Sequence, residues 1–184
     1  MKLLLASHNE DKLRELRSAL PDWEIALVDT DEEPVEDGKT FLENARLKAQ
    51  HGRRHAPPDA WVAGEDSGIE AAALGGRPGV HSARWADDGV AQLLRELEGV
   101  SDRRARYVSQ LVVLAPDGEE IHARGTLAGT VSDAPRGSEG FGYDPILIPV
   151  GQTRTVAELG NEWKARNSHR ARAASELARR LAER

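Results

Sequence analysis

Apolar and polar residues near the start of the chain follow an order that predicts a strand and then a helix. Residues 3–6 form a short apolar run, which polar residues end. Three leucines then recur with the spacing of one helix face until Pro21, so residues 10–20 are predicted to form an amphipathic helix. A strand that leads directly into a helix indicates an α/β fold.

The later apolar runs predict further strands. Residues 23–28 and 60–63 have the composition of short strands, and the second of these is expected to end at a glycine. Residues 105–115 and 120–131 are rich in β-forming side chains and are joined by a Pro-Asp-Gly turn, which predicts a long antiparallel hairpin. A last short strand is predicted over residues 146–148.

Four further helices are predicted from their caps and apolar faces. A Thr-x-x-Glu capping box, whose hydroxyl and carboxylate satisfy backbone donors at a helix start, precedes residues 41–51 and recurs at Thr155. Residues 88–97 place their aliphatic side chains on one helix face, and Ser168 can cap a C-terminal helix. The expected architecture is therefore α/β, with helices flanking a long, twisted mixed β-sheet.

Composition places the chain among soluble globular proteins. Its 184 residues, 39% hydrophobic and 30% charged, fit one domain spanning residues 1–184. No apolar segment approaches the roughly 18 residues that a membrane-spanning helix needs, and the apolar start is too short for a signal peptide. The absence of cysteine excludes disulfides, thiol nucleophiles and Cys-ligated zinc, and it fits a reducing compartment. We therefore expect a soluble cytoplasmic protein.

The formal net charge of −6 conceals an uneven distribution. Residues 164–184 contain seven Lys or Arg and two Glu, a net charge of +5, so the preceding 163 residues carry −11, the difference between −6 and +5. A net negative charge disfavours nucleic acid polymers and anionic membranes as partners. His169 and Arg170 follow the predicted cap Ser168, where a helix N-terminus favours anions. A bound phosphate group and a solvated basic helix face are both open interpretations.

The first predicted helix has a similar start. Ser7, His8 and Asn9 leave the first strand, and Lys12 lies in the first helical turn. Backbone donors, a hydroxyl, an amide and a cation at one helix start can bind an anion, although the glycine spacing of a P-loop or a dinucleotide fingerprint is absent. The alternative is that Asn9 and Lys12 are an ordinary cap and a surface residue.

Acidic residues could balance such phosphates through a metal ion. Glu65 and Asp66 follow the short predicted strand, and open α/β sheets bind ligands beyond the carboxyl ends of their strands. Oxygen ligands without cysteine suit Mg²⁺ or Mn²⁺, and Glu36 or Glu43 could join them from the region of the helix over residues 41–51. Each of these acids is alternatively a solvated loop residue.

These residue types favour metal-assisted hydrolysis of a phosphate compound. Without a thiol, a nucleophilic serine motif or a histidine metal motif, the available nucleophile is water, attacking a phosphorus whose charge is spread by Lys12, Lys48 and Arg170. Residues 140–144 (GFGYD) offer aromatic faces for a nucleobase and a carboxylate for hydrogen bonding. The two aromatic side chains could equally anchor this loop in the core.

Six segments, in order along nearly the whole chain, carry a family resemblance. They are residues 7–12 (SHNEDK), 36–49 (EDGKTFLENARLKA), 65–68 (EDSG), 75–84 (GGRPGVHSAR), 140–145 (GFGYDP) and 168–170 (SHR). They resemble the successive motifs of the noncanonical purine nucleoside triphosphate pyrophosphatases, the Ham1/inosine triphosphatase family. The resemblance implies a mixed α/β fold with two lobes around a cleft, a homodimer, and hydrolysis of ITP, dITP and XTP to the monophosphate and pyrophosphate with Mg²⁺, for which Mn²⁺ can substitute.

The resemblance also implies roles for residues by position. Asp66 is the expected proton acceptor and a metal ligand, Glu36 and Glu65 help to hold Mg²⁺, and Lys48 acts beside Asp66 on the triphosphate. The implied substrate-binding residues are Ser7, His8, Asn9, Glu10, Asp11, Lys12, Ser67, Phe141, Gly142, Tyr143, Asp144, Lys164, His169 and Arg170.

Several alternatives stay open. His8 stands where a small residue is common in the family, and donors from Lys164 or Arg170 are expected to favour a base with a C6 carbonyl over adenine. The alternative functions are a pyrophosphatase of pyrimidine or modified nucleotides, a non-catalytic nucleotide sensor and a nucleic-acid-binding module. Three acids compete for the second metal-ligand position: Glu33, Glu36 and Glu43.

Overall fold

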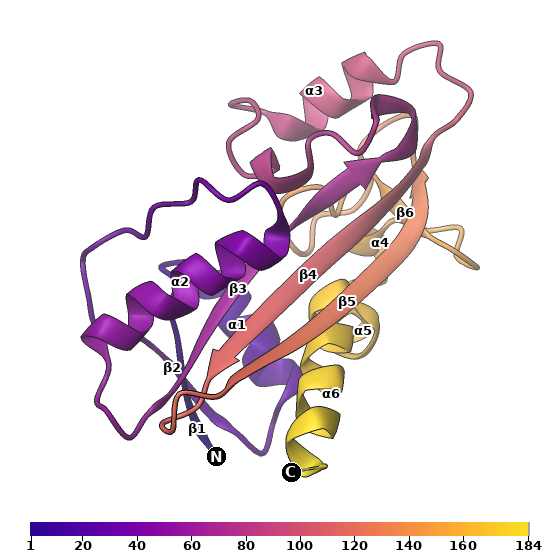
Figure 1. Cartoon of the computed structure of the whole chain (residues 1–184). Helices are drawn as coiled ribbons and strands as arrows, with labels where there is room; N and C mark the ends of the chain where they lie inside the picture. The colour runs from indigo at the N-terminus through magenta and orange to yellow at the C-terminus, as the bar shows by residue number, and fades with distance from the viewer. Residues whose placement is uncertain (184) are drawn as a thin grey trace.

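A computed structural model describes residues 1–183, and its centre is one six-stranded mixed sheet in the order β2-β1-β3-β4-β5-β6 (Figure 1). The strands are β1 (Lys2–Leu5), β2 (Glu24–Leu27), β3 (Trp61–Ala71), β4 (Arg104–Leu114), β5 (Glu120–Val131) and β6 (Leu147–Pro149). β1 runs parallel to β2 and β3, whereas β3, β4, β5 and β6 pair antiparallel. The expected α/β architecture with a long mixed sheet is confirmed.

Helices cover both faces of this sheet (Figure 1). They are α1 (Glu10–Ala19), α2 (Phe41–His55), α3 (Gly89–Glu96), α4 (Val156–Leu159), α5 (Asn161–Asn167) and α6 (His169–Ala182), with 3₁₀ turns η1 (Ala72–Leu74) and η2 (Gly79–His81). Gly64 of β3 meets α2, and Gly125 of β5 meets α6. Because the register places these two glycines on opposite faces, α2 lies on one side of the sheet and α6 on the other.

Capping residues and apolar spacing in the sequence predict most of the helices. Asn9, Thr155 and Ser168 cap α1, α4 and α6 through their side chains, as their positions in the sequence predict. The helix α5 was missed, because it has seven residues, no apolar stripe and no side-chain cap. Within residues 1–183, no helix is long and apolar enough to cross a membrane.

The third strand is much longer than the sequence pattern predicts. The expectation of a strand that ends at residue 63 is wrong, because β3 continues through Gly64 and Gly68 to Ala71. A Cβ on Gly64 would lie 2.0 Å from the carbonyl oxygen of Ala45 in α2, and one on Gly68 would lie 2.3 Å from Ser82 Oγ. These glycines therefore allow close approach of a helix and a turn to the strand and do not end it. The consequence is that the acidic pair lies in the middle of a strand.

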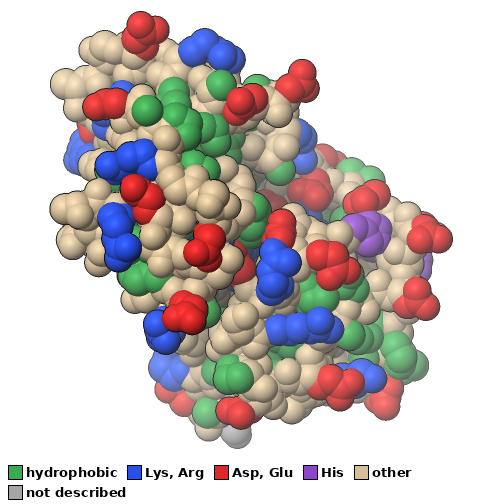
Figure 2. Space-filling view, turned by 180° about the vertical axis from the view of Figure 1, so that it is seen from behind, with side chains coloured by type: hydrophobic (Ala, Val, Ile, Leu, Met, Phe, Trp, Pro, Cys, Tyr) green, Lys and Arg blue, Asp and Glu red, His purple; other side chains and the backbone are tan. Residues whose placement is uncertain are grey.

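The two largest hydrophobic clusters of the described residues lie toward opposite ends of the long strands β3, β4 and β5. One packs β1, α1 and α6 against the end that contains Ala63, and the other packs α3 and α4 against the end that contains Ile69. Figure 2 shows acidic and basic side chains interspersed around a hollowed region on the face opposite the view of Figure 1. On β3, the residues between Ala63 and Ile69 that line the main cavity are Asp66, Ser67 and Gly68.

Candidate active site

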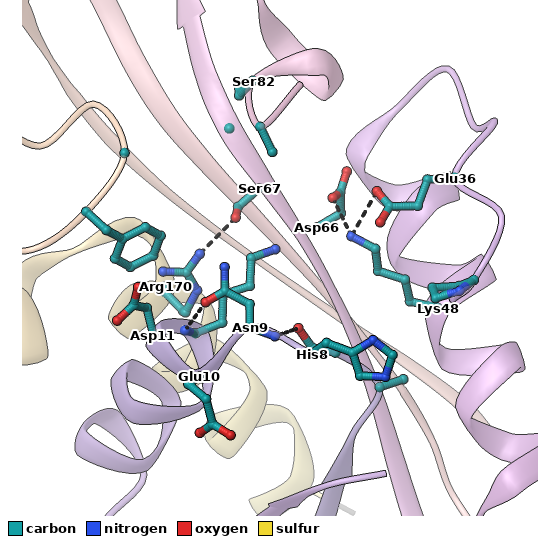
Figure 3. Close-up of a pocket in the computed structure, with 18 of the residues that line it drawn as sticks. His8, Asn9, Glu10, Asp11, Glu36, Lys48, Asp66, Ser67, Ser82 and Arg170 are labelled. Carbon is teal, nitrogen blue, oxygen red and sulfur yellow. Dashed lines mark hydrogen bonds and ion pairs between the residues drawn. The ribbon is translucent and has the colours of Figure 1, made fainter. Parts of the chain in front are cut away.

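A cavity of about 690 Å³ collects segments that are far apart in the sequence. It is lined by the loop between β1 and α1, the acidic loop between β2 and α2, the middle of β3, the loop after β5, Lys164 of α5 and the start of α6 (Figure 3). Most residues expected at the site line it: Ser7, His8, Asn9, Glu10, Asp11, Lys12, Glu36, Lys48, Asp66, Ser67, Phe141, Gly142, Tyr143, Asp144, Lys164, His169 and Arg170. Of the residues expected at the site, Glu65 and the competing candidate Glu43 lie outside the lining.

The loop between β1 and α1 has the geometry of an anion-binding helix start. Asn9 Oδ1 accepts a hydrogen bond from the backbone N–H of Lys12 at 3.0 Å, and Ser7 Oγ accepts one from the N–H of Asn9 at 3.1 Å. The positive end of α1 therefore opens toward the cavity. The side chains of Glu10 and Asp11 add negative charge to the same turn, so the backbone, rather than these carboxylates, is suited to a phosphate.

Lys48 joins two carboxylates at one end of the cavity (Figure 3). Its Nζ lies 2.8 Å from Asp66 Oδ1 and 3.1 Å from Glu36 Oε2, and Asn44 donates to Asp66 Oδ2 at 3.3 Å. Asn44 and Lys48 share one face of α2 because they are four residues apart. The short distance between α2 and β3 that Gly64 permits brings both side chains onto the strand.

Burial and ion pairing act in opposite directions on the protonation of this pair. Burial disfavours the charge of Lys48, but Asp66 and Glu36 outweigh this effect, so the pKa of Lys48 is raised. Burial also raises the pKa of Asp66, and Lys48 offsets only part of that rise. Asp66 is therefore a carboxylate whose basicity is increased by its surroundings.

The structure distinguishes the three acids that compete to join Asp66. Glu33 and Glu36 both line the cavity, but Glu36 reaches the ammonium of Lys48, whereas Glu33 binds the exposed His8 at 2.7 Å. Glu43 accepts from the backbone N–H of Lys39 at 2.6 Å, outside the cavity. The predicted reciprocal capping box is therefore only half present: the N-cap threonine accepts from Glu43 N, but the Glu43 carboxylate binds one residue further back.

Glu65 points away from Asp66, because neighbouring residues of a strand face opposite sides of the sheet. It is fully buried and binds Lys12 Nζ at 2.8 Å, Arg170 Nε at 3.2 Å and the hydroxyl of Ser109 at 2.8 Å. Burial acts to raise its pKa, but Arg170 and Lys12 hold that pKa far below its usual range. The two adjacent acids do not converge on one cation in this structure, and Glu65 instead anchors two basic side chains.

The other end of the cavity combines cations with an aromatic ring. Lys164 Nζ lies 4.7 Å from the centroid of the Phe141 ring, and the guanidinium carbon of Arg170 lies 5.7 Å from it. Lys164 also pairs with Asp144 at 2.6 Å and with Glu15 at 2.5 Å, and Arg170 pairs with Glu15 as well. Sequence reasoning missed Glu15; the available signal was its position three residues after Lys12, on the same side of α1.

The two aromatic side chains in the segment 140–144 have different surroundings. Phe141 is half-buried beside the cavity cations, whereas Tyr143 is buried in the second core and donates its hydroxyl to the Ser82 carbonyl at 2.9 Å. Burial raises the pKa of Tyr143 to about 12. Tyr143 therefore anchors the loop, and Phe141 is the ring placed to stack on a ligand.

His169 contributes a neutral ring to the same wall. It is buried and stacks on Tyr107 with centroids 4.5 Å apart and an angle of 13° between the rings. Burial, together with the positive charge of Arg170, holds its pKa well below the usual value. The Tyr107 hydroxyl donates to Asp144 at 3.2 Å, which places the ring pair against the carboxylate that binds Lys164.

The donor set around Lys48 fits a hard divalent cation. Oxygens of Asp66 and Glu36 converge on one position, which the ammonium of Lys48 approaches in this structure. Magnesium uses one or two carboxylates together with waters and phosphate oxygens, so these two side chains are a sufficient protein contribution. The site can therefore hold phosphates at its carboxylate end and a flat, polar ring between Phe141 and the cations at its other end.

The chain is similar to known proteins over nearly its whole length. A family model described as the Ham1 family matches residues 3–180. A protein of Symbiobacterium thermophilum named dITP/XTP pyrophosphatase is 47% identical, covering 98% of this chain and 94% of its own length. A protein of the same name from Bdellovibrio bacteriovorus is 40% identical, covering 98% of each chain. The structure of the Staphylococcus aureus Ham1 protein matches with a TM-score of 0.87 and 34% identity over 100% of this chain and 99% of that chain.

Proposed function

This chain belongs to the Ham1 family, and on that premise we propose that it hydrolyses noncanonical purine nucleoside triphosphates, dITP, XTP and ITP, to the monophosphate and pyrophosphate with Mg²⁺. The observation that carries the proposal is the cavity with two unlike ends. Asp66, Lys48 and Glu36 meet at one end, and Phe141 lies beside cations at the other. A nucleotide has the same two parts, an anionic phosphate chain and a flat base.

At the phosphate end, Asp66 is the proposed base. It takes a proton from a water molecule whose oxygen forms a bond to the α-phosphorus, while the bond from that phosphorus to the bridging oxygen of the β-phosphate breaks and pyrophosphate leaves. The raised pKa of Asp66 favours this role, because a stronger base is a better proton acceptor at neutral pH. Asp66 and Glu36 would hold a divalent cation, which would neutralise charge on the phosphate oxygens. Lys48 adds a fixed positive charge beside them.

At the base end, the proposed selectivity between purine bases depends on an N–H donor of Lys164 that is left for the ligand. An ammonium has three N–H donors, and Lys164 directs two of them to Asp144 and Glu15. The third can donate to a C6 carbonyl, which hypoxanthine and xanthine carry, whereas adenine carries an amine donor at that position. A buried donor that faces another donor loses its hydrogen bond, so adenine is disfavoured. Phe141 stacks on the nucleobase. The ion pairs of Arg170 with Glu65 and Glu15 hold its guanidinium in position.

The proposal is tested by the products formed from ITP, dITP, XTP, GTP, ATP and dUTP with Mg²⁺, Mn²⁺ or EDTA. We expect pyrophosphate and monophosphate from the first three substrates, loss of turnover in EDTA, and loss of turnover in Asp66→Asn. Asp59→Asn is the control, because Asp59 is an exposed acid in a turn outside the cavity. Orthophosphate as the sole product, preference for dUTP, or full activity of Asp66→Asn contradicts the proposal.

The proposal includes a homodimeric, cytoplasmic enzyme whose catalytic domain is the whole chain, residues 1–184. Light scattering coupled to size-exclusion chromatography measures the mass of the assembly, and a mass of one chain, 20.1 kDa, contradicts the dimer. Limited proteolysis tests whether the chain is a single domain. Because the proposed site takes residues from both ends of the sequence, a stable fragment that contains only half of the cavity contradicts a single domain.

A further inference from the structure

Two histidines and an acid come together beside the acidic loop, outside the Asp66 cluster. His51 and His55 lie on α2, and Glu32 lies in the loop of residues 28–40 that joins β2 to α2. One nitrogen of each ring and one carboxylate oxygen of Glu32 lie within 4.8 Å of one another. We infer that Glu32, His51 and His55 form a second metal site, which takes a transition-metal ion of the Zn²⁺ or Co²⁺ class and fastens the acidic loop to α2.

The helix fixes the spacing of the two imidazoles. Residues four apart share one face of a helix, and the ring centroids of His51 and His55 are 4.7 Å apart. His55 Nε2 lies 3.5 Å from Glu32 Oε2. A tetrahedral ion with bonds of about 2.0–2.1 Å separates its ligands by about 3.3 Å, so the Glu32–His55 pair is already near that separation. The ligand atoms of the group lie within 4.8 Å of one another, so binding of the ion requires contraction of the remaining separations by up to about 1.5 Å.

The donor set separates this site from the Asp66 cluster. Two imidazoles and a carboxylate suit zinc, cobalt or nickel, whereas Mg²⁺ prefers oxygen ligands alone. The histidines lie three and seven residues beyond Lys48, which is about 5 and 10 Å along the axis of α2. The chain therefore presents two neighbouring cation positions with different chemical preferences.

The surroundings of His51 prepare it as a ligand. His51 is buried, and its Nε2 lies 3.0 Å from the backbone carbonyl of Glu32. Donation of an N–H to that carbonyl leaves the lone pair on Nδ1, and a carbonyl acceptor of this kind is the usual partner that orients a metal-binding histidine. Nδ1 faces the guanidinium of Arg54 at 3.1 Å. Arg54 is exposed, so its side chain can turn into solvent when a cation binds.

Occupation of this site would affect the cavity through the loop. The loop has no regular secondary structure, and it carries Glu36, which reaches Lys48. Glu32 and His51 also line the cavity, whereas His55 does not. A metal bond from Glu32 to α2 shortens the free part of the loop on the side of Glu36 and restricts the positions that this carboxylate can adopt.

Metal binding by the full chain, measured without substrate, tests the inference. Metal-free protein is titrated with Co²⁺ while its visible absorption is recorded, and with Zn²⁺ in a calorimeter. We expect one equivalent of Co²⁺ with the absorption of a nitrogen-ligated ion, and a rise in Tm of about 5–10 °C at a free Zn²⁺ concentration of about 100 times the Kd. His55→Ala should lose the Co²⁺ absorption and weaken Zn²⁺ binding on the order of 100-fold.

Two matched variants separate this site from others. His122→Ala removes a half-exposed histidine that also faces a glutamate, Glu120, on β5, and it should bind Zn²⁺ as the parent does. Asp66→Asn should keep the Co²⁺ absorption although its hydrolysis is lost, so a failed second site and a failed proposed function give different results. Arg54→Ala should bind Zn²⁺ more tightly. Parent-like Zn²⁺ binding by His55→Ala, or no saturable Co²⁺ site in the parent, overturns the inference.

Discussion

Replacement of Glu65 by glutamine tests whether this acid is an anchor for cations or a metal ligand. Glu65 is fully buried and is the shared partner of Lys12 and Arg170, which approach its carboxylate at 2.8 and 3.2 Å. Glutamine has nearly the same shape and can still accept from Ser109, but it carries no charge. The substitution therefore removes the charge and leaves the packing of β3 in place.

The expected cost follows from the two cations that lose their partner. Removal of one member of a buried ion pair costs about 3–5 kcal/mol, because a buried charge is left uncompensated. Arg170 keeps Glu15 as a second partner, so the lower part of that range is expected. For a chain of this size each kcal/mol corresponds to about 2–4 °C, so Tm should fall by about 6–15 °C.

Urea unfolding and a thermal scan of parent and Glu65→Gln measure this cost. Glu70→Gln is the control on the same strand: Glu70 pairs with Arg106 at 2.6 Å, but that arginine is half exposed, so a loss below about 1 kcal/mol is expected. A drop below about 1 kcal/mol for Glu65→Gln, together with weaker Mg²⁺ binding, would refute the anchoring role and restore Glu65 as a metal ligand.

The remaining predictions concern charge, pH and close packing. Lys48→Met should lower kcat by about 100-fold or more with little change in fold, as steady-state kinetics and circular dichroism would show. The hydrogen bond to Glu33 raises the pKa of His8, so its contribution to stability is complete below the unfolded value of about 6.5 and is lost as pH rises through the folded pKa. The difference in free energy of unfolding between parent and His8→Ala should therefore shrink from pH 6 to pH 8.5, and because His8 is exposed its largest value should stay below about 1 kcal/mol. Gly64→Ala should destabilise the fold by about 2 kcal/mol or more in urea, since its Cβ would lie 2.0 Å from a backbone oxygen of α2.

Local chemistry explains why so many elements are predictable from the sequence. The caps at Asn9 and Ser168 and the turn before β5 act within a few residues, so their signals are complete in the sequence. The length of β3 depends instead on the approach of α2 and of η2 to Gly64 and Gly68, which no local pattern records. The length of β3 bears on the site, because adjacent side chains of a strand face opposite sides of the sheet, whereas a loop does not impose this separation on Glu65 and Asp66.

The contacts of Glu15 show a second limit of sequence reasoning. It lies in an ordinary amphipathic helix, and the one local signal, its position three residues after Lys12, does not show which distant cations it pairs with. Its role arises because α1 packs against α5 and α6, which brings Lys164 and Arg170 to one carboxylate. Partners more than a hundred residues apart become visible only when the packing is known.

The paired charges also change the meaning of the basic C-terminal segment. Its excess of Lys and Arg suggested free cations for a triphosphate, but the cations at the cavity already have acidic partners. Lys12, Lys48, Lys164 and Arg170 stand against Glu15, Glu36, Glu65, Asp66 and Asp144, which is four positive charges against five negative ones. This set cannot neutralise several phosphate charges by itself. Its donors can orient a nucleotide, and the need for further positive charge is the physical reason that the proposed reaction includes a divalent cation.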